Sequence, residues 1–237
     1  MDPDIYGKGL LSFVNGDENA FFTVESNRAE TEEWPVALFF RDYGEMPDAE
    51  RIALDRAQGE ILDVGAGAGS HTLFLQNQGK KVTAMDLSPG AAEAMRRRGV
   101  QNVVCEDFFR YNGNRFDTLL FLMNGIGIAG TLNRVPLFLE KARSILRPGG
   151  KIVLDSSDIL YLYEEEDGSV LLDLNAPYYG ELEYRFLFSG EMGDCFEWLF
   201  IDYGTLAGYA HQYGFSCRKL YEDDHYLYLA ELIKTGE

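Results

Sequence analysis

The stretch EILDVGAGAGSH, residues 60–71, joins a short apolar run to three glycines that alternate with small residues. An apolar run that ends at a glycine is typical of a buried strand, and apolar residues at helical spacing follow in SHTLFLQNQG. Glycines between a strand and a helix let a ligand approach backbone N–H groups and the positive N-terminus of the helix. The stretch therefore predicts a strand, a ligand-binding turn and a helix in direct succession.

Strand and helix signals alternate from residue 60 to residue 155. Strands that are apolar on both faces are typical of parallel sheets covered by helices, so the pattern predicts a doubly wound α/β fold. Ligands of such sheets bind beyond the carboxyl ends of the strands. One helix is expected to begin with Ser88 as its cap and Pro89 in its first turn, and another to end at the Pro-Gly-Gly of RVPLFLEKARSILRPGG. The further strands expected are KKVTAMDLS, VQNVVCEDFF, RFDTLLFLMNG and GKIVLDSSD.

The two ends of the chain are expected to pack around this sheet. Residues 1–58 are rich in aromatic side chains and are predicted to cover the active-site cleft, while residues 59–237 form the ligand-binding domain. An insertion at about residues 160–202 contains ELEYRFLFSG and DCFEWLFID, which predict an antiparallel β-hairpin. This hairpin could serve as a lid or as a homodimer contact. The other elements expected are a helix in DAERIALDRA, a helix in TLAGYAHQYG, and strands in FSCRKLYEDD and HYLYLAELIK.

Composition excludes several classes of partner. The 237 residues include 21 Lys and Arg against 39 Asp and Glu, a net charge of −18 that repels nucleic-acid phosphates. The chain has no uncharged apolar run of about 18 residues and no signal-peptide pattern, so we expect a cytoplasmic protein without a membrane partner. Its three cysteines are far apart, which excludes a zinc spacing and makes a disulfide framework unexpected.

The spacing of the glycines bears on the ligand. Dinucleotide-binding turns carry G-x-G-x-x-G, but here Ser70 holds the third position and the pattern is G-x-G-x-G, with Gly65, Gly67 and Gly69. Five segments in order resemble the motifs of class I S-adenosylmethionine-dependent methyltransferases. They are ILDVGAGAGSH, VTAMDLSP, CEDFF, FDTLLFLMNGIGI and ILRPGGKIVLD. The resemblance implies a mostly parallel seven-stranded sheet and S-adenosylmethionine as the cofactor.

The resemblance also implies which residues bind the cofactor. Asp86 would accept hydrogen bonds from both ribose hydroxyls, and Asp63 would order the loop or help to hold the methionyl ammonium. Asp107 and the Phe108 backbone would contact the adenine, with Leu87 beside it. The full set implied is Asp63, Gly65, Ala66, Gly67, Gly69, Asp86, Leu87, Asp107, Phe108, Met123 and Asn124.

Methyl transfer from a sulfonium is an in-line displacement, so positioning supplies much of the rate and a base is needed only if the acceptor must lose a proton. The resemblance names no obligatory catalytic side chain. The candidates are Asn124, His71 and Asp155, with Asp158 and His211 as weaker ones, and no metal is expected because no partners for Asp155 are evident.

The acceptor is expected to be a small molecule. The fourth motif reads MNGIG, without the prolines of the amino-methylating DNA enzymes, and no cysteine follows a proline as in the cytosine enzymes. Small-molecule enzymes of this class often build the acceptor site from an N-terminal segment and an insertion after the fifth strand. Aromatics there could wall an acceptor, and Arg41 or Arg185 could pair with a carboxylate, or these residues could be core and solvated surface. The candidates are Tyr6, Trp34, Phe39, Arg41, Tyr178, Tyr179, Tyr184, Arg185 and Trp198.

Other functions stay open on sequence grounds. A non-catalytic module could hold S-adenosylmethionine or S-adenosylhomocysteine with the same motifs, because binding and catalysis are separable. A nicotinamide-dependent oxidoreductase could use a similar sheet, but the glycine spacing disfavours it. An aminopropyl transferase would need an acid in the fourth motif, where this chain has Asn124.

Overall fold

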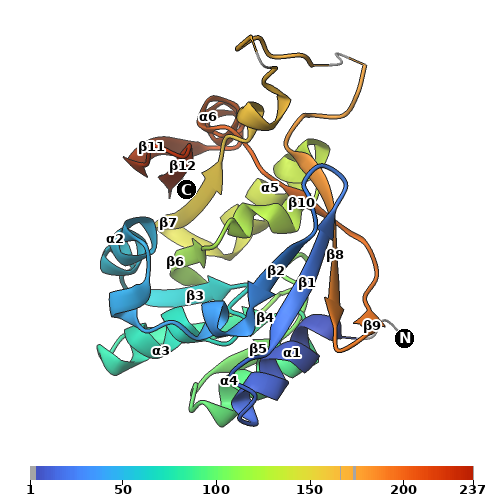
Figure 1. Cartoon of the computed structure of the whole chain (residues 1–237). Coiled ribbons are helices and arrows are strands. Elements are labelled where there is room, and N and C mark those ends of the chain that lie inside the picture. The colour runs from blue at the N-terminus through green and yellow to red at the C-terminus, as the bar shows by residue number, and fades with distance from the viewer. Residues whose placement is uncertain (1–3, 166, 173–174, 237) are drawn as a thin grey trace.

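The computed structural model describes residues 4–165, 167–172 and 175–236. Its main sheet has seven strands in the order β11-β12-β7-β6-β3-β4-β5 (Figure 1). Strands β3 to β7 are parallel, and β12 runs antiparallel to both of its neighbours. This order confirms the predicted doubly wound fold. The strands are β3 (Glu60–Val64), β4 (Lys81–Asp86), β5 (Val103–Cys105), β6 (Phe116–Phe121), β7 (Leu146–Ser157), β11 (Phe215–Glu222) and β12 (Leu227–Lys234).

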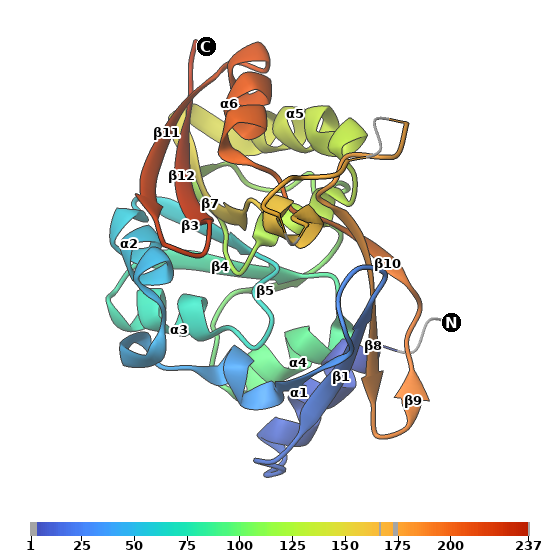
Figure 2. The ribbon, with the colours of Figure 1, turned by 45° about the horizontal axis from the view of Figure 1, so that its top comes forward.

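Helices cover both faces of the main sheet (Figure 2). Successive residues of β3 point to opposite faces, so Leu62 packs with α5 and α6 while Ile61 packs with α2 and α3. Among the described residues, no helix is both long and apolar enough to cross a membrane. The helices are α1 (Ile5–Val14), α2 (Asp48–Arg56), α3 (Ser70–Asn77), α4 (Pro89–Arg97), α5 (Val135–Ile145) and α6 (Tyr203–Gln212).

A second, antiparallel sheet stands beside the main one and has the order β10-β8-β1-β2, with β9 also paired to β8 (Figure 1). The predicted hairpin is present as the β8–β10 pair, but it does not stand alone, because β1 from the N-terminal segment pairs with the other edge of β8. The N-terminal segment and the insertion are therefore parts of one structure. The strands are β1 (Phe21–Ser26), β2 (Glu32–Pro35), β8 (Glu181–Phe188), β9 (Glu191–Met192) and β10 (Phe196–Leu199).

The first helix is an element that the sequence did not predict. Two glycines weaken the helix propensity of α1, and its position depends on tertiary contacts with α4 and β8. Asp4 caps α1 by accepting from the Gly7 N–H at 2.9 Å, and it also accepts from the Gly90 N–H at 2.7 Å and the Ser88 hydroxyl at 2.8 Å. One carboxylate thus joins the N-termini of α1 and α4.

The end of α5 and the start of β7 both lie earlier in the chain than expected. The Pro-Gly-Gly expected to end α5 lies inside β7, which already begins at Leu146. The pairing of β7 with β6 shifts in register between Phe116 and Thr118, so this segment is an irregularity in the strand.

Parts of the predicted N-terminal segment, insertion and ligand-binding domain lie outside the described residues. These are residues 1–3, 166, 173–174 and 237.

The contact between α1 and α4 makes a testable prediction. A Cβ on Gly90 would lie 2.5 Å from the Gly7 Cα, a backbone atom that cannot move without displacing α1. We expect Gly90→Ala to lower the free energy of unfolding by about 1–3 kcal/mol, as overpacking does. Gly208→Ala on α6 is the matched control, because a Cβ there meets no atom within 4 Å. Thermal unfolding that changes equally in both variants would contradict this account.

Candidate functional site

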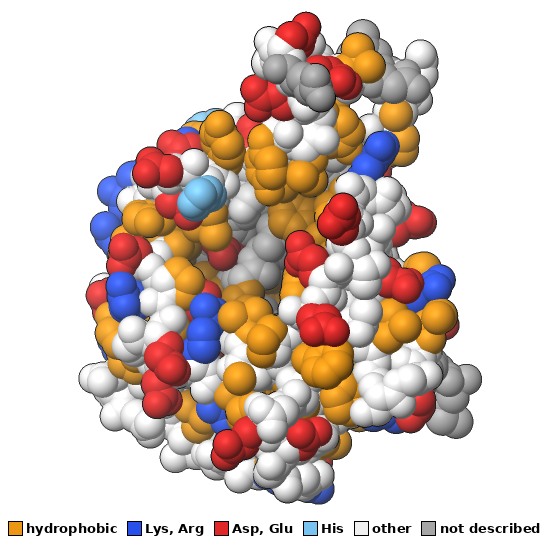
Figure 3. Space-filling view, in the orientation of Figure 1, with side chains coloured by type: hydrophobic (Ala, Val, Ile, Leu, Met, Phe, Trp, Pro, Cys, Tyr) orange, Lys and Arg blue, Asp and Glu red, His pale blue; other side chains and the backbone are white. Residues whose placement is uncertain are grey.

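A cavity of about 960 Å³ lies between the carboxyl ends of the main sheet and the second sheet. Figure 3 shows a hollow there with hydrophobic side chains around it and acidic side chains on the side of the second sheet. The volume is at the upper end of the range for small-molecule sites, so the cavity has room for two ligands. Every residue of the implied cofactor set lines this cavity except Gly69.

The glycine turn after β3 needs glycine for two different reasons. Gly65, Gly67 and Gly69 all have φ between 56° and 81°, a region that other residues rarely adopt. A Cβ on Gly67 would lie 2.6 Å from the Tyr6 hydroxyl, inside the cavity. A Cβ on Gly69 would instead lie 2.9 Å from the Met95 side chain, in the interior between α3 and α4. Gly69 thus allows close helix packing, and its predicted ligand contact has no support in this geometry.

Asp86, at the end of β4, is buried and accepts a hydrogen bond from this turn. Its Oδ2 accepts from the Gly67 N–H at 2.8 Å, and its Oδ1 accepts from the Ser88 N–H at 2.9 Å. Burial raises the pKa of Asp86 to about 6 despite these two hydrogen bonds. Each carboxylate oxygen keeps a further acceptor site that a ribose hydroxyl could use.

Asp63 is the penultimate residue of β3 and faces the first turn of α3. Its Oδ2 accepts from the Thr72 hydroxyl at 2.7 Å, which joins the strand to the helix that follows the glycine turn. Burial raises the pKa of Asp63, although His71 and Thr72 oppose the change. Of its two predicted roles, the ordering of the loop is the one that this contact supports.

The residues implied for the adenine follow β4 and β5 and differ in exposure. Asp107 accepts from the Phe109 N–H at 2.9 Å and so shapes the turn. Phe108 is buried, with its ring 5.1 Å from that of Phe121. Leu87 is 70% exposed at the edge of the cavity, where a ligand ring would cover it.

Met123 and Asn124 follow β6, and both adopt a left-handed conformation with φ of 59° and 56°. Such backbone strain in residues other than glycine persists only where surrounding contacts hold it. The Asn124 N–H donates to Asp155 at 2.9 Å, its Oδ1 accepts from the Ser156 hydroxyl, and its Nδ2 donates to the Leu199 carbonyl. The Asn124 side chain is therefore engaged in joining β6, β7 and β10.

The remaining catalytic candidates separate into two groups. Asp155 is buried behind Asn124 and does not line the cavity, and burial raises its pKa to about 7. Asp158 accepts from the Tyr179 hydroxyl at 2.8 Å, and His211 is exposed on α6. His71 alone of these four lines the cavity.

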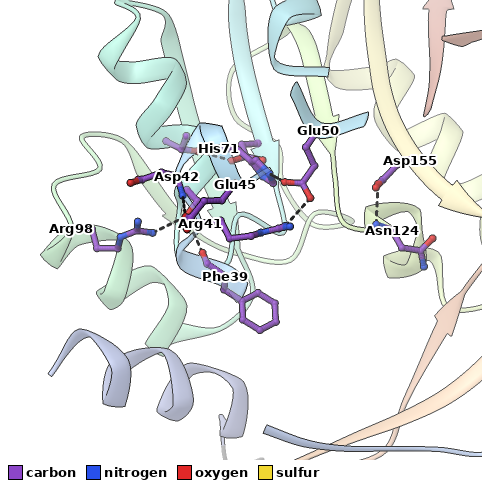
Figure 4. Close-up of polar contacts among 12 residues, drawn as sticks. Phe39, Arg41, Asp42, Glu45, Glu50, His71, Arg98, Asn124 and Asp155 are labelled. Atoms are coloured by element: carbon purple, nitrogen blue, oxygen red, sulfur yellow. Dashed lines mark hydrogen bonds and ion pairs between the residues drawn. The ribbon is translucent and has the colours of Figure 1, made fainter. Parts of the chain in front are cut away.

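His71 belongs to a polar cluster whose centre, Glu50, the sequence analysis missed. Glu50 Oε2 lies 2.7 Å from His71 Nε2, and Glu50 Oε1 accepts from Arg41 Nη2 at 2.7 Å (Figure 4). Glu50 sits on the same face of α2 as the buried Ala53 and Leu54. An acid among apolar residues at helical spacing was therefore the available signal.

Some of the predicted acceptor residues line the cavity and others do not. Tyr184 and Phe186 of β8 point to the cavity, while Arg185 between them points to the other face and contacts Cys195 at 2.8 Å. Tyr178 and Tyr179 donate to Asp202 and Asp158 and lie outside the cavity. The cavity includes Tyr6, Trp34, Phe39, Arg41, Tyr184 and Trp198 from the predicted set, and Phe186, Phe196 and Phe200, which were missed. Within the described ranges, no three His, Cys, Asp or Glu side chains are grouped to hold a metal ion.

Comparison with known proteins identifies similar chains. Residues 62–154 match the family described as "Methyltransferase domain". A solved S-adenosylmethionine-dependent methyltransferase from Bacteroides fragilis, in complex with S-adenosylhomocysteine, is 43% identical with a TM-score of 0.92, over 98% of this chain and 95% of that one. Demethylmenaquinone methyltransferase of Tropheryma whipplei is 30% identical over 40% of each chain, and ubiquinone biosynthesis O-methyltransferase of Xanthomonas oryzae is 31% identical over 44% of this chain and 45% of its own. This chain thus spans less than half the length of these two curated relatives.

The burial of Asp86 makes a prediction about stability and pH. The pKa of Asp86 in the folded protein, about 6, exceeds the ordinary value of 3.8, so the free energy of unfolding falls as the pH rises from about 4 through 6. Asp86→Asn removes this fall. The free energy of unfolding of the variant, relative to that of the parent protein, should therefore increase by about 2 kcal/mol from pH 4.5 to pH 8. Chemical unfolding at the two pH values measures the difference, and a pH-independent difference would contradict the assignment.

Proposed function

Because this chain belongs to the S-adenosylmethionine-dependent methyltransferase family, as its likeness to the Bacteroides fragilis protein over nearly the whole chain shows, we propose that it methylates a small molecule with an apolar, ring-containing body. S-adenosylmethionine is its cofactor. The observation that carries the proposal is that the glycine turn and Asp86 share one cavity with the aromatic face of the second sheet.

The residues at the strand ends fit this cofactor. A Cβ on Gly65 would meet no atom within 4 Å, so a ligand can lie against the backbone there, and the Asp86 carboxylate can accept from a pair of hydroxyls. The glycine that allows close helix packing, Gly69, comes one residue earlier than in dinucleotide-binding turns, whose third position is Ser70 here. We assign the ribose to Asp86 and the adenine to the strand ends that carry Leu87 and Asp107.

The second sheet supplies the surface proposed for the acceptor. Tyr184, Phe186 and Phe196 form a continuous stack, with Trp198 edge-on to Phe196 at a centroid distance of 5.9 Å. Aromatic faces of this kind favour flat apolar ligands, and they stack with rings at these distances. The names of the two curated relatives agree with a small-molecule acceptor, and the net charge of −18 disfavours nucleic acid.

In this proposal, the alignment of the acceptor with the methyl group of the cofactor supplies the catalysis. The cofactor supplies a methyl group on a sulfonium, a strong electrophile that needs only a nucleophile aligned behind the carbon. In this proposal the second sheet holds the acceptor against the glycine turn and excludes water, while Asn124 fixes the backbone after β6 between the two. A proton acceptor is required only for an acceptor that must lose a proton.

Cofactor binding makes the first prediction of this proposal. S-adenosylhomocysteine at 100 times its dissociation constant should stabilise the protein by about 2.7 kcal/mol, a rise in melting temperature of roughly 5–11 °C, while NAD at the same concentration has no effect. Gly67→Val should abolish the rise, because its side chain would meet Tyr6 and fill the turn. Equal stabilisation by both ligands would refute the assignment of the cofactor site.

The acceptor surface makes the second prediction. Methyl transfer from tritiated S-adenosylmethionine should be detectable with members of a panel of phenols, ring-bearing amines and aromatic acids, and absent with DNA, RNA and casein. Trp198→Ala should then lower kcat/KM for the accepted compounds by about tenfold or more and leave the affinity for S-adenosylhomocysteine unchanged. Transfer to the polymers alone would contradict the small-molecule proposal.

A further inference from the structure

Two exposed tyrosine rings stack on each other at the carboxyl end of β7. Tyr161 lies in the 3₁₀ turn that follows β7 (Leu160–Tyr163), and Tyr226 lies in the turn between β11 and β12. Their ring centroids are 5.9 Å apart and their planes differ by 19°, yet Tyr161 is 48% exposed and Tyr226 is 55% exposed. The two rings therefore form a flat aromatic surface that is open to solvent, which we call the tyrosine pair.

Strand pairing places the tyrosine pair at the edge of the main sheet that carries the cavity. β12 runs antiparallel to β7, and Leu227 pairs with Ser157 at the carboxyl end of β7. The turn before Leu227 and the turn after Ser157 thus meet beyond the carboxyl ends of the parallel strands, where the cavity also lies (Figure 2). The Asp158 N–H donates to the Tyr226 carbonyl at 3.1 Å and joins the two turns.

Tyr184 connects the tyrosine pair to the aromatic wall of the cavity. Its ring stacks with that of Phe196, and both residues line the cavity. Burial raises the pKa of the Tyr184 hydroxyl to about 12, and the charges of Glu32 and Tyr161 add to the rise, so this hydroxyl lies in the neighbourhood of Tyr161. The aromatic wall therefore continues from Phe196 through Tyr184 toward the tyrosine pair.

The backbone of Tyr226 is strained. Its φ is 63°, and turns between paired strands favour Gly or Asn at such a position, because a larger side chain brings Cβ close to the backbone. The turn holds this conformation through Asp223, whose Oδ1 accepts from the Leu227 N–H at 3.0 Å and whose carbonyl accepts from the Tyr226 N–H at 3.4 Å. Strain of this kind in a bulky residue gathers at ligand-binding positions, so the exposed ring indicates a binding role.

The charges around the tyrosine pair disfavour an anion. Asp158 and Asp223 bind the backbone of the two turns, and Glu32 lies by the hydroxyl that links the pair to the cavity wall. Arg28 contacts the same 3₁₀ turn, but it stacks over the Tyr163 ring at 5.3 Å. A second copy of the chain on this surface would bring the same acids together across a two-fold axis, which their like charges oppose. An uncharged apolar group fits the surface better than either.

We propose that Tyr161 and Tyr226 form an outer subsite for an uncharged ring of the acceptor, which extends out of the cavity past Tyr184. Flat rings stack on aromatic faces at the distances found here. The inference rests on the proposed function and narrows its substrate class. The acceptor is an elongated molecule whose reacting end lies in the cavity and whose other end lies on the tyrosine pair.

Two fluorescent probes with the same rings test the subsite. N-phenyl-1-naphthylamine is uncharged, and 1-anilinonaphthalene-8-sulfonate adds one sulfonate to it. Protein saturated with S-adenosylhomocysteine should bind the uncharged probe about threefold or more tightly than the sulfonate, because of the acids around the pair. Tyr161→Ser and Tyr226→Asn should each weaken binding of the uncharged probe by about fivefold or more and leave the affinity for S-adenosylhomocysteine unchanged.

Phe21→Ser is the matched control. Phe21 is 47% exposed at the start of β1 and does not line the cavity, so its substitution should leave the affinity for the uncharged probe unchanged. Folding of Tyr226→Asn is checked by its melting temperature. Asn tolerates the left-handed conformation, so this temperature should equal or exceed that of the parent protein.

The outcomes separate the subsite from the proposed function. Equal binding of N-phenyl-1-naphthylamine by the parent, Tyr161→Ser and Tyr226→Asn, or no binding by the parent, would overturn the subsite while leaving the cofactor assignment intact. A parent that sediments as a dimer and that Tyr226→Asn converts to a monomer would also overturn it, because a second copy would then cover the pair. A parent that does not bind S-adenosylhomocysteine would instead overturn the proposed function.

Discussion

The arrangement of the site depends on one buried carboxylate, that of Asp86. It accepts from the Gly67 N–H and the Ser88 N–H, and so it joins the turn after β3 to the turn after β4. Ser88 in turn caps α4 and donates to Asp4, which caps α1. The position of Tyr6 against the glycine turn follows from this chain of caps. Burial of the charge costs stability, as the raised pKa of Asp86 indicates, and a ligand whose hydroxyls donate to it would offset that cost.

The second sheet covers the carboxyl ends of the main sheet's strands and so encloses the cavity. A doubly wound sheet presents its strand ends to solvent, and here β1 and β2 from the start of the chain pair with β8 and β10 from the insertion to cover them. Inward-facing residues of β8 alternate with outward-facing ones, so one face of the sheet carries the aromatic wall. The same enclosure places Arg41 and Glu50, from the segment between β2 and β3, beside the first turn of α3. The proposed cofactor and acceptor regions are thus parts of one space.

The sequence predicted the features that local patterns encode. The strand–glycine–helix succession, the Ser88 cap and the alternation in β8 and β10 each depend on neighbouring residues, and all are present. The pairing of β1 with β8 joins residues far apart in the chain, and α1 is a weak helix former held by Asp4, so neither had a local signal. Glu50 resembled an ordinary first-turn acid of a surface helix, and only its contacts with His71 and Arg41 distinguish it. The glycine motif did not reveal that Gly69 packs against α4 and not against the cavity.

The most direct test of this account is a crystal structure of the protein with S-adenosylhomocysteine. We expect both ribose hydroxyls within hydrogen-bond distance of the Asp86 carboxylate, the sulfur between the glycine turn and Asn124, and the aromatic face of the second sheet open toward the sulfur. A complex in which the ribose lies away from Asp86, or in which the sulfur faces away from Trp198 and Tyr184, would contradict the central claim that one cavity holds cofactor and acceptor together.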